Sequence, residues 1–445
     1  MPPTGRPRPR AIVLFSSVAI LAAACSAAGA PSVAPSSGTA PAGSATPIET
    51  APGHDAWLVV GERGDTGLRV ILASTKEQLY ELPIGVPGDR WGHLVASTNT
   101  GGTTVVDEIT VQPELPAWRS RTLEGAWRLP TIGLDPIPVG VVTDDSTLTN
   151  STIVLVEADA PAGASTSRFA VLTGGEPARI IELPGSLEFD ALSPDGSILY
   201  VVEHLPGPPD SHYQVRAIDL PSGVMRDAVI ADKRNLGTSM AGWPLTQAAH
   251  PSGVVFTLYR GVMHPFIHAL HTREAWAVCL DLPEIGHTDA DGALDWGIAQ
   301  SADGRSVFAV NASLGLAAVI DPGEPSISQV TTFDAPRAAA SIELAKFGHG
   351  DVDPVGRRVV STSDGSAVFA AGAGGIVRIE SEGLTVVGRF LEGTAIEALA
   401  ITEDATSLYA LTGDGRILQL DAATGEVRGQ VPGEGYDRLV AMDSW

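Results

Sequence analysis

The feature that most constrains the fold of this chain is a short phrase that returns several times along it. In its clearest form, ALSPDGSILYVVEH at 191–204, the turn signal Ser-Pro-Asp-Gly separates two apolar runs. Short runs rich in Val, Ile, Leu and Tyr, separated by Asp-Gly, Ser-Gly or Thr-Gly pairs, are typical of β-hairpins. The period is 41 to 60 residues, because the second run of successive copies begins at Ser197, Gly253, Ser306, Ser366 and Ser407.

Each copy contains four strand-like runs. A lone four-stranded sheet exposes both faces and must stack on neighbours, so units of this length predict the blades of a β-propeller. Segments 56–74 and 436–445 are left over at the two ends, and pairing between them would complete one more blade and close the ring. The sequence therefore predicts an all-β propeller of seven or eight four-stranded blades. The seven readable units cover 79–125, 127–184, 187–232, 243–283, 296–333, 365–390 and 396–433.

The N-terminus has a different character. Three arginines precede an almost wholly apolar run at 11–24, which is too short to span a bilayer comfortably but fits the core of an export signal. The tail Leu-Ala-Ala-Ala-Cys at 21–25 resembles a bacterial lipobox, although Ala22 stands where that family most often has Leu. The resemblance implies that Cys25 is lipidated and becomes the mature N-terminus. An ordinary cleavage site after the same small residues is the alternative.

A tether is expected to follow, because residues 25–53 consist mostly of Ala, Ser, Pro, Gly and Thr and cannot form a core. We therefore expect a signal peptide at 1–24, a flexible tether at 25–53 and a single propeller domain at 54–445. Such a chain would lie in the cell envelope, on the outer face of the cytoplasmic membrane or in the periplasm, held to the membrane only by its lipid.

The net charge and the cysteine content limit which partners the chain can bind and whether it can form a disulfide. The formal net charge of −24 repels phosphate backbones, so no nucleic acid is expected to bind. If Cys25 carries lipid, Cys279 has no partner for a disulfide, and its apolar surroundings (AWAVCLDLP) favour an inert buried thiol.

The phrases LSPDGSILYVVEH, SADGRSVFAVNA and TSLYALTGDGRILQLDAATGEV resemble YVTN-type repeats and the wider WD40-like propellers of exported bacterial proteins. The resemblance covers about residues 56–443, but Trp-Asp pairs are missing and Gly-His pairs do not recur at the regular place that they have in WD40 repeats. It implies an exported bacterial propeller lipoprotein. Such motifs specify a fold much more strongly than a function.

Several aromatic and acidic residues are candidates for a site. Four tryptophans near the starts of inner-strand runs would lie at one end of the ring, where they line a binding face or pack between blades: Trp91, Trp127, Trp243 and Trp296. His264 joins this candidate face; it shares one face of the expected strand HPFIHALH with His268, whereas His271 takes the other, so the three are too spread out for one metal.

Asp289, Asp291 and Asp295 in GHTDADGALDW resemble half of a calcium loop. The complete pattern, with its terminal Glu, is absent, so a solvated acidic turn is the alternative, and the same applies to GHGDVDP at 348–354. No cofactor is expected, with Ca²⁺ or another divalent metal left as the alternative.

The sequence contains no recognisable nucleophile elbow, phosphate loop or zinc motif. It therefore favours a non-enzymatic, lipid-anchored scaffold, monomeric, that binds an unknown protein or small ligand. The alternatives are a lactonase-like hydrolase or lyase with a metal in the central channel, as found among YVTN-like relatives, and a structural part of an envelope assembly.

Overall fold

The structure is a computed structural model, and all of its described residues belong to one compact unit, Ala45–Trp445. The predicted signal peptide and tether lie outside the described residues, as do Cys25, Trp91, Asp289, Asp291 and 348–354. The described residues are 56–63, 67–82, 85–87, 93–110, 117–132, 141–143, 151–158, 165–206, 212–232, 239–261, 264–283, 295–301, 303–336 and 356–444.

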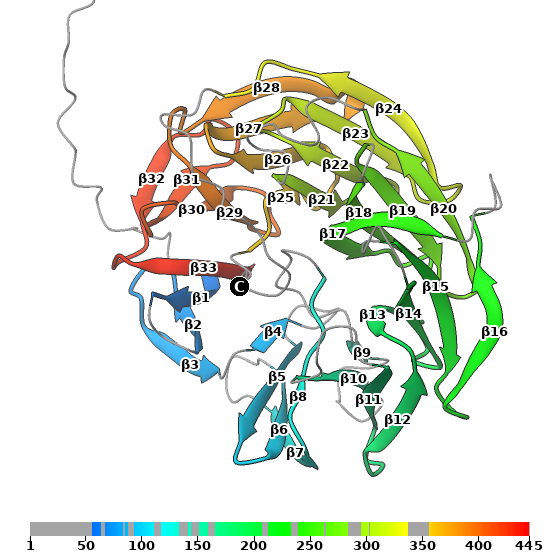
Figure 1. The fold of residues 1–445 in the computed structure, drawn as a ribbon. Helices are drawn as coiled ribbons and strands as arrows, with labels where there is room; N and C mark the ends of the chain where they lie inside the picture. The colour runs from blue at the N-terminus through cyan, green and yellow to red at the C-terminus, as the bar shows by residue number, and fades with distance from the viewer. Residues whose placement is uncertain are drawn as a thin grey trace, which may run out of the picture. The chain divides into compact units, whose positions relative to one another are not determined.

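Antiparallel strands make up nearly all of the regular structure in these ranges, with one 3₁₀ turn, η1 (Glu382–Leu384). They group into eight blades, which Figure 1 shows side by side around a centre. The first four are β1 (Ala56–Glu62), β2 (Leu68–Leu72), β3 (Gln78–Leu82) and β33 (Tyr436–Ser444); β4 (Gly85–Pro87), β5 (His93–Thr100), β6 (Thr103–Thr110) and β7 (Ala117–Glu124); β8 (Trp127–Arg128), β9 (Val141–Thr143), β10 (Ser151–Glu157), β11 (Thr166–Thr173) and β12 (Arg179–Pro184); β13 (Leu187–Leu192), β14 (Ile198–His204), β15 (His212–Asp219) and β16 (Val224–Ile230).

The other four blades follow the predicted repeats closely. They are β17 (Met240–Ala249), β18 (Val254–Gly261), β19 (Phe266–His271) and β20 (Trp276–Asp281); β21 (Trp296–Gln300), β22 (Val307–Asn311), β23 (Leu316–Asp321) and β24 (Ser326–Thr332); β25 (Val359–Ser361), β26 (Ala367–Gly372), β27 (Gly375–Glu380) and β28 (Thr385–Phe390); β29 (Ile396–Ile401), β30 (Ser407–Thr412), β31 (Ile417–Asp421) and β32 (Val427–Gln430). Their inner strands β17, β21, β25 and β29 lie nearest the centre.

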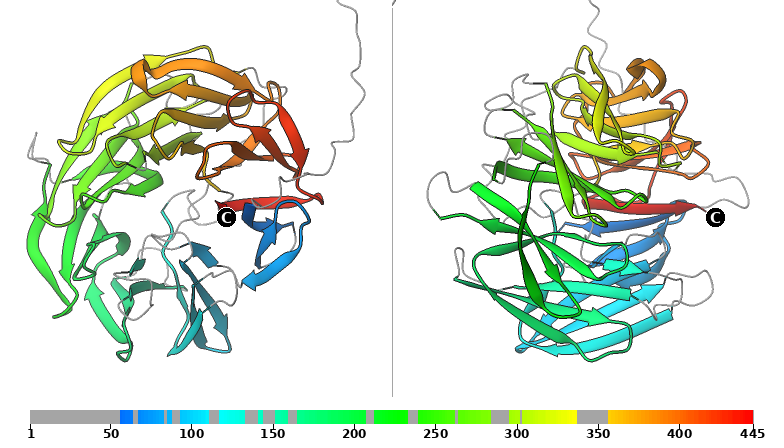
Figure 2. Two further views of the ribbon diagram at one scale, coloured as in Figure 1. Left: turned by 180° about the vertical axis from the view of Figure 1, so that it is seen from behind. Right: turned by 90° about the vertical axis from the view of Figure 1, so that its right-hand side faces the viewer.

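The two ends of the described chain close the ring, as predicted. Strand β33 pairs with β1 from Ala56↔Ser444 to Glu62↔Tyr436, and both views in Figure 2 show the two strands side by side. This blade is the eighth. Two predicted boundaries differ. Strand β3 pairs with β2 in the closing blade, so the start of the unit expected at 79–125 belongs to that blade. The unit expected at 365–390 begins earlier, because β25 (Val359–Ser361) pairs with β26 as its inner strand.

The recurring phrase forms a turn between the first and second strands of a blade, stabilised by side chains. Between β13 and β14, Ser193 Oγ donates a hydrogen bond to Asp195 Oδ1 (2.6 Å), which also accepts one from the backbone N–H of Ser197 (3.1 Å). Gly196 has φ +66°, and a Cβ there would lie 2.4 Å from Thr152 Oγ1 in the neighbouring blade. Glycine is therefore required both for the turn and for the close approach.

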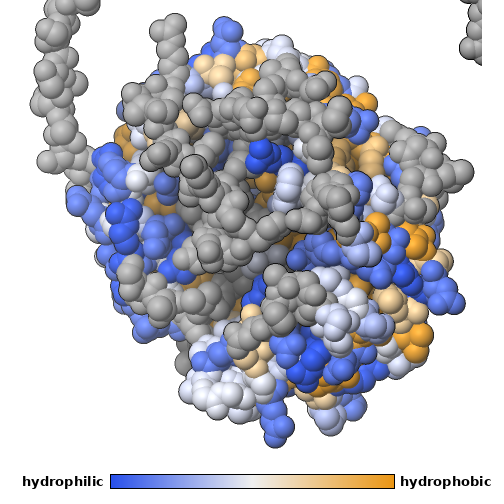
Figure 3. All heavy atoms as spheres, viewed as in Figure 1, coloured by the Kyte–Doolittle hydropathy of each residue, from blue (hydrophilic) through white to orange (hydrophobic). Residues whose placement is uncertain are grey.

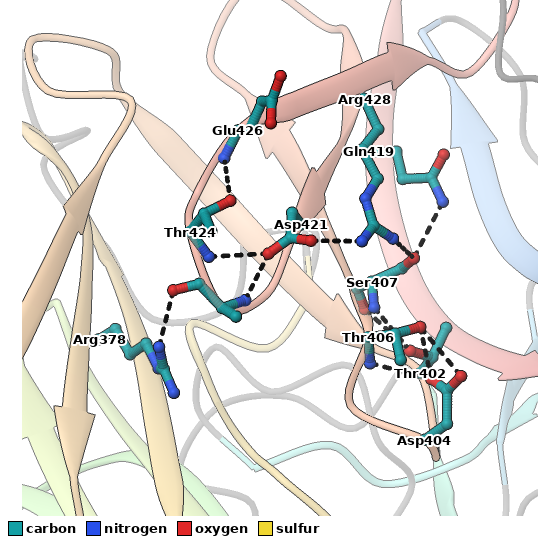
Figure 4. A network of polar contacts seen from close by, with 11 residues as sticks. Arg378, Thr402, Asp404, Thr406, Ser407, Gln419, Asp421, Thr424, Glu426 and Arg428 are labelled. Carbon is teal, nitrogen blue, oxygen red and sulfur yellow. Dashed lines mark hydrogen bonds and ion pairs between the residues drawn. The ribbon is translucent and has the colours of Figure 1, made fainter.

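The same turn recurs in other blades. Thr362 and Asp364 form it before β26, and Figure 4 shows the copy before β30, where Asp404 accepts from the N–H and Oγ1 of Thr406. The hydrogen bond from Thr362, followed by those from Ser366, lowers the pKa of Asp364 to about 2. Aspartate is thus bound as an ionised acceptor, which explains the Asp in the phrase.

Apolar side chains fill every seam between neighbouring blades. Between the last blade and the first, Leu58 and Val60 pack with Tyr409 and Leu411. Each of the other described clusters likewise draws its residues mainly from two adjacent blades. The ring is therefore closed by packing as well as by strand pairing, as expected for sheets that cannot bury their own faces.

One seam has an additional connection. At the beginning of β17, Met240 and Ala241 pair with Tyr213 and His212 of β15, which joins two blades into a single sheet of eight strands.

No helix in the described ranges is long and apolar enough to span a membrane.

Candidate functional site

A small pocket lies at the inner edges of three consecutive blades. Three short stretches line it: Leu245–Thr246 of β17, Trp296–Ile298 of β21, and Gly356–Val359 at the start of β25. Its volume is about 30 Å³. We call it the inner-edge pocket.

Local backbone features let these strands meet. The register of β17 shifts between Pro244 and Thr246, so Leu245 lies at a bulge, a feature that redirects side chains. A Cβ on Gly297 would lie 2.4 Å from Val359 Cγ2, so glycine is needed for the close approach of β21 and β25. The pocket is therefore built by special backbone positions on adjacent inner strands.

A guanidinium is held in place at the pocket by a chain of polar contacts. Arg358 Nη1 lies 3.1 Å from Asp295 Oδ1, and Asp295 Oδ2 accepts a hydrogen bond from Ser313 Oγ at 2.6 Å. Ser313 Oγ also accepts one from the backbone N–H of Ala373 at 3.2 Å. Asp295 is only 4% exposed, so the carboxylate that holds Arg358 is buried and fixed by its two partners.

The preceding residue, Arg357, also lines the pocket. Arg357 is exposed, and its side chain makes no ion pair or hydrogen bond with any residue in the described ranges. Further round the inner edge, burial raises the pKa of Glu397, while the positive charges of Arg358 and Arg63 lower it.

The residues predicted for a binding face are not all together. Trp296 lines the inner-edge pocket, and Trp243, two residues before Leu245, is 40% exposed. Trp127 is buried between blades, where its Nε1 donates to the backbone carbonyl of Glu124 at 2.7 Å. His264 precedes β19, and its Nε2 lies 2.8 Å from Asp281 Oδ1.

Asp295, predicted as a metal ligand, contacts Arg358 and Ser313. The described residues contain no group of three or more His, Cys, Asp or Glu side chains placed to hold a metal ion. A carboxylate paired with a guanidinium serves to orient that guanidinium, which is the role that the contacts of Asp295 support.

A row of polar side chains lies in the interior of one blade. Gln247, Thr257, His268 and Cys279 are cross-strand partners on β17 to β20, and the histidine and the threonine are almost fully buried. Burial lowers the pKa of His268 to about 4 and raises that of Cys279 to about 12. Both groups are therefore uncharged at neutral pH.

Asp190 lies across the seam from this row. Gln247 Nε2 donates to the backbone carbonyl of Asp190 at 2.9 Å, but Asp190 Oδ2 has no hydrogen-bond partner within the described part of the chain. Complete burial raises the pKa of this carboxyl group to about 7. Asp190 is not among the predicted site residues, although an acidic residue inside the apolar inner run LEFDAL is a usable signal.

No protein-family model and no curated protein matches this sequence. Among solved structures, the chain is similar to apo AztD from Citrobacter koseri (12% identity, TM-score 0.54, covering 88% of this chain and 98% of that chain). A second AztD structure from Citrobacter koseri has 11% identity, a TM-score of 0.52 and the same coverage. A putative 6-phosphogluconolactonase from Bacteroides fragilis shares 12% identity over 79% of this chain and 97% of its own, with a TM-score of 0.41, too low to support an argument. At 11–12% identity the AztD likenesses show the fold alone, and with the strand pairing they establish an all-β propeller.

Proposed function

We propose that this chain is a lipid-anchored propeller of the cell envelope that binds a ligand or partner at the inner edges of its blades and catalyses no reaction. The anchor and the location rest on the lipobox-like segment ending at Cys25. The fold provides a rigid ring on which short inner strands present side chains from neighbouring blades.

The observation that carries the binding proposal is the inner-edge pocket with its oriented arginine. Arg358 is held by the buried Asp295, which is held in turn by Ser313. Side chains fixed in this way lose little conformational freedom when a ligand binds, which is the usual design of a recognition site. Binding sites also occur preferentially where several elements present side chains to one concave surface.

A site-specific photo-crosslinker tests the proposal. The probe replaces Trp243, which is exposed and lies two residues before Leu245 of the pocket, in the full-length protein expressed in a bacterial envelope. We expect a defined adduct at this position by mass spectrometry. The matched control places the same probe at Val224, which is 61% exposed on the outer strand β16. No adduct at 243, or equal adducts at both positions, would contradict binding at the inner edge.

The distribution of hydrophilic and apolar side chains on the face drawn in Figure 3 agrees with a localised binding site. The face in Figure 3 mixes hydrophilic side chains with small apolar patches over the coloured blades. Scattered apolar residues of this kind are normal on a soluble surface and do not mark a broad docking area. The proposal therefore rests on the pocket and not on the outer surface.

A further inference from the structure

We infer that the inner-edge pocket recognises an oxyanion, a carboxylate or phosphate group, carried on a small apolar body. The inference rests on the proposed function, because it names the chemistry of the ligand at the same site. Three features of the pocket support it: the arginines, the apolar lining and the volume.

The arginines supply the charge. Arg357 has no described partner for its side chain, and Arg358 keeps a 26% exposed side chain although one of its nitrogens pairs with Asp295. A guanidinium presents several N–H donors in a planar fork, which matches the two oxygens of a carboxylate or phosphate. Burial raises the pKa of the nearby Glu397, and the charges of Arg358 and Arg63 lower it.

Positive charge at the inner edge is also unusual for so acidic a protein. The protein has a formal net charge of −24, yet Arg357 and Arg358 are adjacent at the inner edge and Arg63 acts on the same Glu397 as Arg358 does. A structural role explains the pairing of Arg358 with Asp295 but gives no reason for the exposed Arg357. Local positive charge on an acidic protein attracts an anion to this point in preference to the rest of the surface.

The rest of the pocket supplies apolar contact and limits the size. Leu245, Trp296 and Ile298 form its apolar wall. Sites that enclose a whole drug-sized ligand have volumes of about 300–1,000 Å³, whereas this pocket has about 30 Å³. It therefore accommodates the charged end of a ligand, and the apolar part of that ligand lies against the wall.

Isothermal titration calorimetry of the full-length protein with three related probes tests the inference. Benzoate and phenyl phosphate carry the two oxyanions on the same ring, and benzamide is the uncharged match to benzoate. We expect at least one anion to bind roughly tenfold or more tighter than benzamide, because a charge-assisted hydrogen bond contributes about 1.5–3 kcal/mol. The anion that binds tighter identifies the natural group as a carboxylate or a phosphate.

Two arginine variants test whether the anion binds at the inner-edge pocket. Arg357→Gln removes an exposed charge without orphaning a buried partner, and we expect it to weaken anion binding about tenfold while leaving benzamide unchanged. Arg358→Lys keeps the charge beside Asp295 but removes the fork, and we expect a smaller loss in the same direction. The control, Arg389→Gln, changes an exposed arginine on β28, the outer strand of the same blade, and leaves both affinities as in the wild type.

The outcomes separate this inference from the proposed function. Equal binding of benzoate and benzamide, no binding by any probe, or unchanged anion affinity in Arg357→Gln overturns the oxyanion inference. In each case an adduct from the crosslinker at Trp243 still supports binding at the inner edge. If that adduct is missing as well, the proposed function itself is wrong.

Discussion

The backbone of Val60 in β1 pairs with that of Leu439 in β33, and both side chains are almost completely buried in the same cluster. Residues almost 380 positions apart thus form one local contact. The other blades are formed by strands that are close in sequence, so this pairing is what joins the two ends of the described chain within one blade.

Truncating Leu439 should weaken this closure. We expect Leu439→Ala to lower the free energy of unfolding by about 2–5 kcal/mol, because it removes a fully buried side chain and leaves a cavity. Denaturation in guanidinium chloride measures the change. Val427→Ala on the outer strand β32, where the side chain is 42% exposed, is the control and should change stability by less than about 1 kcal/mol. Equal losses of unfolding free energy in the two variants would show that the closing seam contributes no more to stability than an exposed outer strand.

The buried carboxyl group of Asp190 should make stability depend on pH. Burial raises its pKa in the folded state from 3.8 to about 7, so its protonated form is the one that the fold accepts. Its stabilising contribution is complete below about pH 4 and is lost as the pH rises through about 7. Since one pKa unit corresponds to about 1.4 kcal/mol, the loss is on the order of 4 kcal/mol.

Asp190→Asn tests this dependence, because asparagine stays uncharged throughout. We expect the variant to be more stable than the wild type at pH 8 and to show little difference at pH 4, in unfolding temperatures measured across that range. Asp227→Asn, an exposed change on β16, is the control. Parallel pH profiles for wild type and Asp190→Asn would contradict the assignment.

Lipidation predicts a simple change in location. We expect Cys25→Ser to move the protein from the membrane fraction to the soluble fraction of the envelope, because a serine cannot carry the thioether-linked lipid. Immunoblots of the two fractions measure it. Cys279→Ser changes a thiol within β20 and should leave the protein at the membrane. Membrane retention of Cys25→Ser would show that the lipid is not the anchor.

Much of the fold follows from local sequence. The Ser-Pro-Asp-Gly turn carries its own hydrogen bonds, so 193–196 could be recognised without any knowledge of the rest of the chain. The boundary at β3 could not, because Gln78–Leu82 reads as the start of a new unit and only its pairing with β2 places it in the closing blade.

The candidate site was harder to predict than the fold, because it also depends on which strands meet in space. Trp296 and Asp295 were identified from their sequence, but the pocket forms only where their blade meets Arg358 and Leu245 of its neighbours. Asp190 escaped prediction because the register shifts between Phe189 and Ala191, which places it at a bulge and takes it out of the alternation that strand patterns assume.

The pairing of β15 with β17 gives the fourth and fifth blades a common backbone ladder. We therefore expect local opening of one of these blades to be coupled to opening of the other, more than between blades that contact each other through side chains alone. Asp190 lies in the fourth blade, and the polar row lies in the fifth. Ionisation of the Asp190 carboxyl group at higher pH should consequently lower the stability of these two blades together.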